Sequence, residues 1–88
     1  MTKLSGRVTV HGSKPAATAT VELHNSSGDV VDQVQADQDG RYTYHLSPGE
    51  WSVRVWDEHG HRGQGQITLA EGDEETLDLD LEEPEGGH

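Results

Sequence analysis

Residues 41–56 decide the fold, and they read RYTYHLSPGEWSVRVW. Large apolar side chains occupy alternate positions on both sides of the turn-forming residues 47–50, and mostly polar or charged side chains lie between them. Successive side chains of a β-strand point to opposite faces, so this period of two predicts two half-buried strands, over residues 41–46 and 51–56. If residues 47–50 form a hairpin loop, Arg41 pairs with Trp56 and Thr43 with Arg54 on the outer face.

The same alternation recurs along the rest of the chain between turn residues. It predicts strands at residues 4–10, 18–24, 30–36, 67–69 and 77–81, a polar loop at 57–65, and a tight turn with a positive φ at Gly40. Seven short strands with a turn about every ten residues predict an all-β fold, namely a seven-stranded, antiparallel-rich β-sandwich of the immunoglobulin-like kind. The shared parity within each segment predicts a core made of Val8, Val10, Val21, Leu23, Val34, Tyr42, Tyr44, Trp51, Val53, Val55, Ile67, Leu69, Leu77 and Leu79.

Length and composition allow one domain. The chain has 88 residues, and we expect residues 1–81 to form the domain and residues 82–88 to form a flexible acidic tail. It has no cysteine, which excludes disulfides, thiolate nucleophiles and cysteine-based zinc sites. No apolar run reaches the length of a signal peptide or a membrane span, so we expect a soluble chain unless it was cut from a longer precursor.

The charge is strongly negative and unevenly distributed. Six Lys and Arg against 17 Asp and Glu give a net charge of −11, which argues against nucleic acid as a partner. The first twenty residues carry three basic residues and no acid, whereas residues 71–88 carry nine acids and no Lys or Arg. The acidic last strand is therefore a candidate contact surface.

Several motifs together resemble those of a known family. They are SGRV at residues 5–8, KPAA at 14–17 leading into VEL at 21–23, ADQDGRYTY at 36–44, and LSPGEWSVRV at 46–55. From Leu4 to about Leu81 the chain resembles a carboxypeptidase regulatory-like domain, with Trp51 where that family usually has Tyr. The resemblance implies a transthyretin-like sandwich that serves as an accessory module of enzymes, adhesins or surface assemblies.

A second resemblance concerns the turn Asp39-Gly40-Arg41, which is similar to the Asp-Gly-Arg turn of the hydroxyisourate hydrolases. That resemblance implies a need for a His near the end of the first strand, the turn Arg, a second His from the last strand and a C-terminal Tyr-Arg-Gly-Ser. Here His11 falls in the loop after the first strand, residues 76–81 contain no His, and the chain ends in EGGH. A site without its base and its anion-binding groups cannot promote the reaction, so we predict that the chain is not an enzyme.

Two segments contain residue types that bind metals. DEHGH at residues 57–61 offers imidazole and carboxylate groups, and DQDG at residues 37–40 is similar to the start of a calcium loop. The first lacks a recognised ligand spacing, and the second lacks the later ligands of a calcium loop. We interpret both as turns and predict no metal and no cofactor.

The outer face of the predicted hairpin is the leading candidate for a binding surface. It would gather Arg41, His45, Arg54 and Trp56 into a basic and aromatic patch on an acidic protein, and such residues often anchor protein interfaces. Two other interpretations are a self-contained cation–π pair of Arg41 with Trp56 and a sugar ring stacked on Trp56.

Three hypotheses for the function follow. The first is a structural or interaction module that contacts a protein partner, for example a decoration protein on a virus capsid or another large assembly. The second is an accessory carbohydrate- or surface-binding module of a longer secreted protein. The third, which the missing residues disfavour, is a hydrolase of the hydroxyisourate type. The sequence does not assign a compartment.

Overall fold

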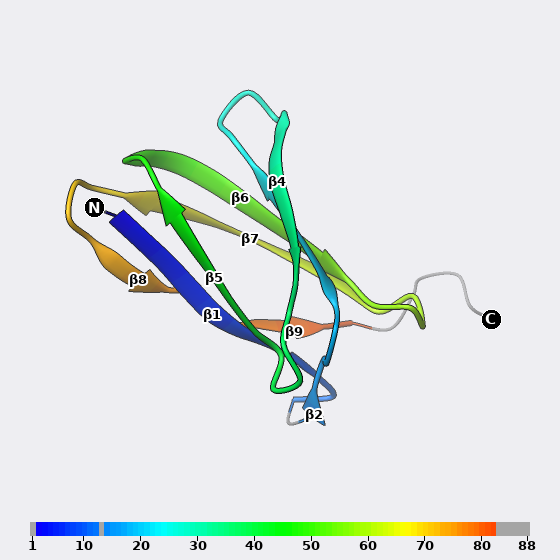
Figure 1. The fold of residues 1–88 in the computed structure, drawn as a ribbon. Helices are drawn as coiled ribbons and strands as arrows, with labels where there is room; N and C mark the ends of the chain where they lie inside the picture. The colour runs from blue at the N-terminus through cyan, green and yellow to red at the C-terminus, as the bar shows by residue number, and fades with distance from the viewer. Residues whose placement is uncertain (1, 13, 83–88) are drawn as a thin grey trace.

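The computed structural model describes residues 2–12 and 14–82, and this part of the chain is a β-sandwich without helices. Two sheets lie face to face, as Figure 1 shows, and the predicted all-β sandwich is confirmed. The strands are β1 (Thr2–Val10), β2 (Lys14–Pro15), β3 (Thr20–His24), β4 (Val30–Gln35), β5 (Arg41–Leu46), β6 (Gly49–Trp56), β7 (Arg62–Leu69), β8 (Glu74–Thr76) and β9 (Leu79–Leu81). The described residues contain no helix of the length and apolar character that would span a membrane. Of the predicted tail only Glu82 is described, and residues 83–88 lie outside the described part.

The first sheet is built around β1. β5 and β2 pair with β1 in the antiparallel sense along one edge. β8 and β9 pair with it in the parallel sense along the other edge, and both keep the same register. The second sheet has the order β4-β3-β6-β7, with antiparallel neighbours throughout, so β4 and β7 are its edge strands.

The predicted inward positions are the observed ones. Nine of the predicted core residues are buried, and the other five, Trp51 among them, are partly buried and pack against the core. Trp56, one strand position beyond the buried Val55, faces the opposite side and is 37% exposed, so the predicted parity of β6 is confirmed. Leu4, Ala16, Ala19, Ala36 and Leu81 are also buried, although the predicted core did not include them.

Two tyrosines of β5 fasten the layers together. The Tyr44 hydroxyl donates to the carbonyl oxygen of Val21 at 3.0 Å, which joins the first sheet to β3 of the second. The Tyr42 hydroxyl donates to the carbonyl oxygen of Leu77, between β8 and β9. A buried polar group costs free energy unless it is hydrogen-bonded. Each tyrosine hydroxyl therefore stabilises only the arrangement of strands that provides its acceptor.

The predicted last strand is interrupted, and Gly6 lies opposite the interruption. There the Leu77 amide donates to Ser5 O at 2.8 Å, and the Arg7 amide donates to a carboxylate oxygen of Asp78 at 2.9 Å. A Cβ atom on Gly6 would lie 1.9 Å from the Leu77 carbonyl oxygen. Glycine is therefore required at this position by the close approach of the Leu77 backbone.

The predicted hairpin between residues 41–46 and 51–56 is wrong. β5 pairs with β1, whereas β6 pairs with β3 and β7, so residues 47 and 48 carry the chain from one sheet to the other. Pro48 has no amide to donate to a ladder, and Gly49 has a φ of 147°, which L-residues rarely adopt. The chain therefore leaves the first sheet at this point. β5 pairs along its whole length with the nine-residue β1 instead.

The predicted loop at residues 57–65 is also too long. β7 begins at Arg62 and pairs with β6 over its whole length. Gly63 and Gly65 occupy its inward positions, where the side chains of Leu77, Leu79 and Leu81 pack against them. Since glycine contributes no apolar signal, the alternation of this strand was not visible in the sequence.

Candidate functional site

The four residues predicted to form one patch lie on two different sheets. Arg41 and His45 are exposed on β5 of the first sheet, and Arg54 and Trp56 are exposed on β6 of the second. All four face outward as predicted, but the outer faces of two stacked sheets point in opposite directions. The predicted single patch and the Arg41–Trp56 pair are therefore wrong, because they depended on the hairpin.

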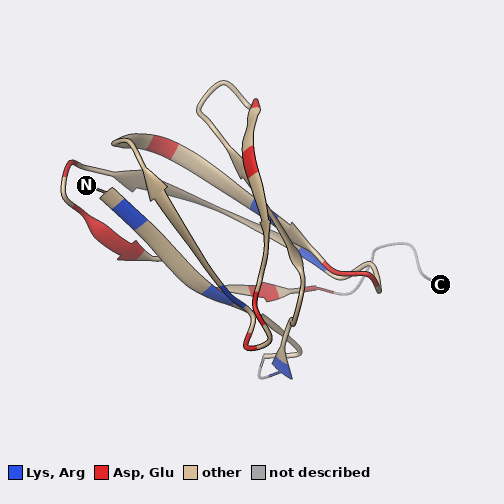
Figure 2. Cartoon of the chain, in the orientation of Figure 1, with Lys and Arg blue, Asp and Glu red and all other residues tan. Residues whose placement is uncertain are grey.

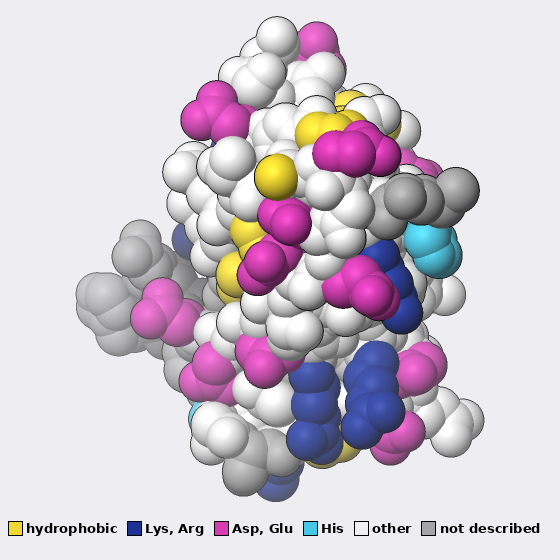
Figure 3. All heavy atoms as spheres, turned by 90° about the vertical axis from the view of Figure 1, so that its left-hand side faces the viewer, with side chains coloured by type: hydrophobic (Ala, Val, Ile, Leu, Met, Phe, Trp, Pro, Cys, Tyr) yellow, Lys and Arg dark blue, Asp and Glu magenta, His cyan; other side chains and the backbone are white. Residues whose placement is uncertain are grey.

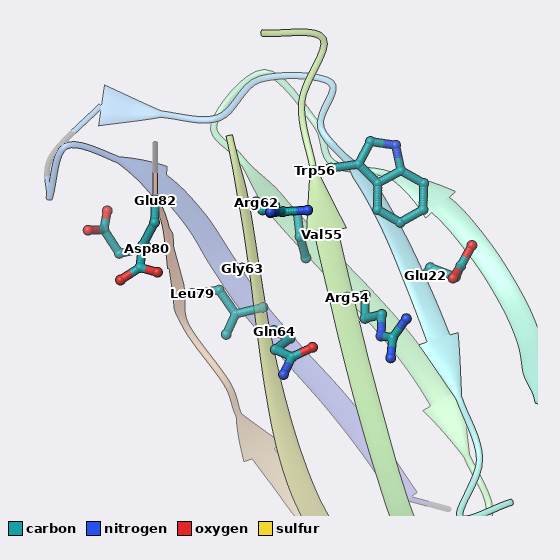
Figure 4. Close-up of a pocket in the computed structure, with 10 residues that line it drawn as sticks. All are labelled: Glu22, Arg54, Val55, Trp56, Arg62, Gly63, Gln64, Leu79, Asp80 and Glu82. Atoms are coloured by element: carbon teal, nitrogen blue, oxygen red, sulfur yellow. The ribbon is translucent and has the colours of Figure 1, made fainter. Parts of the chain in front are cut away.

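Around Trp56 the second sheet assembles a different set of residues, which we call the Trp56 face. Strand register places Thr20 and Arg62 on either side of Trp56, and Glu22 and Gln64 on either side of Arg54. A hollow of about 950 Å³ runs along this face and around the edge of β7 to Leu79, Asp80 and Glu82 (Figure 4). The Trp56 face consists of Thr20, Glu22, Arg54, Trp56, Arg62 and Gln64.

The arginines of this face lack acidic partners. Every ion pair within the described part of the chain involves histidine, and no Lys or Arg there lies at salt-bridge distance from a carboxylate. Glu22, which faces Arg54 across the strands, instead approaches Nε2 of the buried His24 at 2.6 Å. Arg54 and Arg62 thus keep their donors available, which is unusual on a protein with a net charge of −11.

His24 explains why Glu22 is turned away from Arg54. Its Nδ1 lies 3.2 Å from the carbonyl oxygen of Gly28, and its Nε2 faces the Glu22 carboxylate. Both neighbours are acceptors, so both contacts are hydrogen bonds only when both ring nitrogens carry a proton.

The first sheet presents a second charged surface. Register places Arg7 beside Arg41 and Lys3 beside His45, and the acidic β8 and β9 run along the other side of β1. Figure 2 shows this succession of basic and acidic positions on neighbouring strands, and Figure 3 shows acidic side chains spread over this side while the basic ones gather in a few places. The acidic strand predicted as a second contact surface therefore lies beside basic residues.

Some carboxylates of the acidic last segment already accept hydrogen bonds within the domain. Asp80 accepts hydrogen bonds from the Thr9 hydroxyl and the Gly12 amide, both at 2.9 Å. Asp78 accepts the Arg7 amide. This reduces what the acidic strand can offer to a partner.

The two segments with metal-binding residue types form turns. Asp37 accepts the amides of Arg41 and Asp39, which hold the pKa of its carboxyl below the ordinary value. Burial raises the pKa of Asp57, but the hydrogen bonds from the His61 ring and from the His61 and His59 amides outweigh it, and the pKa is lowered. No group of three or more His, Asp or Glu among the described residues is arranged to hold a metal ion.

Comparison with known proteins assigns the family. A profile of the carboxypeptidase regulatory-like domain matches residues 3–82. The chain belongs to the carboxypeptidase regulatory-like domain family. No curated protein sequence matches the chain. Among solved structures, the 5-hydroxyisourate hydrolase of Klebsiella pneumoniae is similar in fold, with a TM-score of 0.68, 20% identity, and coverage of 90% of this chain and 89% of that one.

The fold of this regulatory-like domain is thus transthyretin-like, and domains of its family are generally non-catalytic modules. The hydrolase similarity is one of fold alone. In this chain β8 and β9 carry no histidine, and the His11 ring lies edge-on to His61 of the β6–β7 loop, with 5.6 Å between ring centroids.

Four residues of the Trp56 face were not predicted from the sequence, namely Thr20, Glu22, Arg62 and Gln64. Arg62 and Gln64 fell in the predicted loop, because Gly63 and Gly65 beside them give no apolar alternation. Glu22 could be predicted to face outward, but not to lie beside Arg54, because its strand is distant in sequence.

Proposed function

We propose that this regulatory-like domain is a non-catalytic binding module that contacts a protein partner through the Trp56 face. The observation that carries the proposal is an exposed tryptophan between two arginines that make no ion pair, beside an open hollow. Tryptophan and arginine are the residues most enriched among those that dominate binding energy at protein interfaces.

Each part of the face has a role in this proposal. The indole of Trp56 supplies apolar area that a partner removes from water. Arg54 and Arg62 donate hydrogen bonds to carboxylate or carbonyl oxygens of the partner, and their planar groups allow paired bonds. The net negative charge disfavours acidic partners over most of the surface, and the two arginines favour an acidic surface patch at this face.

The capsid-decoration hypothesis names one such partner and stays a prediction. A bound particle would have to cover the Trp56 face, so co-sedimentation of the domain with that particle should be lost when Trp56 and Arg54 are replaced.

A carbohydrate ligand is the second candidate, and one observation favours it. Trp56 is surrounded by side chains with planar hydrogen-bonding groups, namely Glu22, Arg54, Arg62 and Gln64. A sugar ring could stack on the indole while these groups bind its hydroxyls. Quenching or a blue shift of Trp56 fluorescence on addition of a glycan, in a Trp51→Phe background, would establish this candidate in place of a protein.

The test compares two double variants on opposite sheets. Trp56→Ala with Arg54→Ala removes the centre of the Trp56 face, and Arg41→Ala with His45→Ala removes the other half of the predicted patch. A photo-crosslinking residue at Gln64, and separately at Thr43 of β5, identifies the partner in cells that make the protein.

We expect crosslinks from position 64 and not from position 43, and loss of binding only in the Trp56→Ala, Arg54→Ala variant. Crosslinks from position 43 alone, or full binding by the folded Trp56→Ala, Arg54→Ala variant, would remove the Trp56 face from consideration.

A further inference from the structure

The sheets of this sandwich have open edges, and the edges differ in how they are protected. An edge strand exposes backbone N–H and C=O groups that can pair with another strand, and proteins block this with charges, bulges or short strands. The pairing of β4 with β3 contains a bulge, because Leu23 pairs with Asp32 but the next residue, His24, pairs with Val30. The Asp32 carboxylate accepts the neighbouring Gln33 amide at 2.8 Å. β8 and β9 have three residues each and carry acids. β5 has Arg41 at its first position, as β7 has Arg62, so the surroundings of these two edges distinguish them.

β7 has none of these protections over most of its length. Its eight residues read RGQGQITL, without proline, lysine or an acid, and its pairing with β6 shows no bulge. Its one charged residue, Arg62, lies at the first position and forms a two-bond backbone bridge with Glu82. Among the described residues, nothing else pairs with the outer edge of this strand.

The Arg62–Glu82 bridge also shows which backbone groups are open. The Arg62 amide donates to Glu82 O at 3.1 Å and its carbonyl accepts from Glu82 at 2.9 Å, so both groups point away from β6. Backbone direction alternates along a strand. Gln64, Gln66 and Thr68 therefore direct their N–H and C=O groups toward the open edge, while the residues between them bond to β6.

The surroundings of this edge define what can bind there. Inward side chains of an added strand would meet leucines that pack on the β7 glycines, of which Leu77 is only partly buried. Across the opening lies the segment 74–82, which carries five acids and no Lys or Arg. The hollow beside β7 is lined on that side by Asp80 and Glu82 (Figure 4). An occupant with lysine or arginine complements this charge.

We propose that the open edge of β7 binds an extended, basic polypeptide segment of another protein by antiparallel strand addition. The antiparallel sense continues that of the Arg62–Glu82 bridge. Main-chain bonds to Gln64, Gln66 and Thr68 hold the segment and its apolar side chains face Leu77. Its net positive charge complements the negative charge of the neighbouring segment 74–82. The site lies beside the Trp56 face and shares Gln64 with it, but it uses the backbone of Gln64 and does not depend on Trp56 or Arg54.

A synthetic peptide of alternating lysine and valine, labelled for fluorescence anisotropy, tests the proposal. In an antiparallel addition with valine facing inward, the lysine residues lie opposite Gln64 and Gln66 and exchange hydrogen bonds with them. N-methylation of the lysine amides should weaken binding by at least about tenfold, the equivalent of one lost bond. N-methylation of the valine amides should leave it nearly unchanged, because those amides point away from β7.

A matched pair of protein variants provides the second arm. Gln66→Lys places a charge on the β7 edge, and Gln33→Lys makes the same charge change on the β4 edge. We expect Gln66→Lys to weaken peptide binding roughly tenfold more than Gln33→Lys, since long-range electrostatics are alike in the two variants. The Trp56→Ala, Arg54→Ala variant should bind the peptide as the original protein does, which separates this site from the proposed function.

Four results would overturn the proposal. They are no binding of the unmodified peptide at low salt, equal binding of the two N-methylated peptides, stronger loss from valine methylation, and equal effects of the two lysine variants. Sedimentation of the protein alone gives the remaining check. A dimer that becomes monomeric only in Gln66→Lys would show that a second copy of this chain occupies the edge.

Discussion

Replacement of Gly6 by alanine tests the account of how the last strands join the sheet. The added methyl group would lie 1.9 Å from the Leu77 carbonyl oxygen and 2.7 Å from the Tyr42 hydroxyl. The first of these atoms belongs to the backbone, so the overlap cannot be relieved by rotating a side chain. The junction between β8 and β9 has to move away from β1.

The expected loss follows from the contacts at that junction. Moving Leu77 removes the hydrogen bond from Tyr42, the bond from the Leu77 amide to Ser5, and the bond from the Arg7 amide to Asp78. Each of these three hydrogen bonds contributes about 1 kcal/mol, and the Leu77 carbonyl would in addition be left unpaired. The free energy of unfolding should therefore fall by about 3–4 kcal/mol. A domain of this length has a total of about 4–13 kcal/mol, so Gly6→Ala removes a large part of it.

Urea unfolding followed by tryptophan fluorescence measures the effect, with Gly28→Ala as the control. Gly28 has a φ of 86° and no neighbouring atoms within 4 Å of an added methyl group. Its replacement should cost only about 1 kcal/mol for the left-handed conformation. Tyr42→Phe should add less in the Gly6→Ala background than alone, because the carbonyl it bonds has already moved. Equal losses in Gly6→Ala and Gly28→Ala, or additive losses with Tyr42→Phe, would refute the account.

Three further predictions concern pH, metals and the core. Burial, with a smaller contribution from the charge of Asp32, raises the pKa of Tyr44 from 10.0 to about 12. The unfolded chain then releases this proton at a lower pH than the folded chain does. The free energy of unfolding therefore falls as pH rises from about 10 toward 12, by about 1 kcal/mol at pH 11. The Tyr44→Phe variant should show a correspondingly smaller drop in urea midpoint between pH 8 and pH 11. Chelators should leave the melting temperature unchanged, since Asp57 and Asp37 are engaged in turns, and a fall of several degrees would reveal a bound metal; the same preparation should not hydrolyse 5-hydroxyisourate above the background rate. Trp51→Ala should cost about 2–3 kcal/mol in urea unfolding, below the range for a fully buried aromatic residue, because Trp51 is only partly buried.

Local signals predicted the strands but not their partners. The alternation of Tyr42, Tyr44, Val53 and Val55 is a property of each segment, and it survives whatever the segment pairs with. Pairing depends on the whole set of strands. The assumption that neighbouring segments form a hairpin failed at Pro48, where the chain changes sheets.

The same limit applies to the site. The outward direction of Arg54 and Trp56 was predictable from parity, and the structure confirms that direction. Their neighbours Glu22 and Arg62 come from β3 and β7, and Arg41 and His45 lie on the opposite sheet. Binding by the Trp56 face itself stays a proposal.

The motifs that carry the family resemblance are occupied in holding the sandwich together. Gly6 admits the Leu77 backbone, Gly40 has a φ of 78° and lies against the Val8 carbonyl, and Tyr42 and Tyr44 bond to carbonyls of other strands. These contacts stabilise the fold, and a side chain engaged in them is not available to bind a ligand. The surface residues Arg62 and Gln64 and the open edge of β7 fall outside those motifs. A resemblance carried by such motifs therefore indicates a shared fold but does not indicate a shared partner. The partner of this chain has to be sought from its own exposed residues.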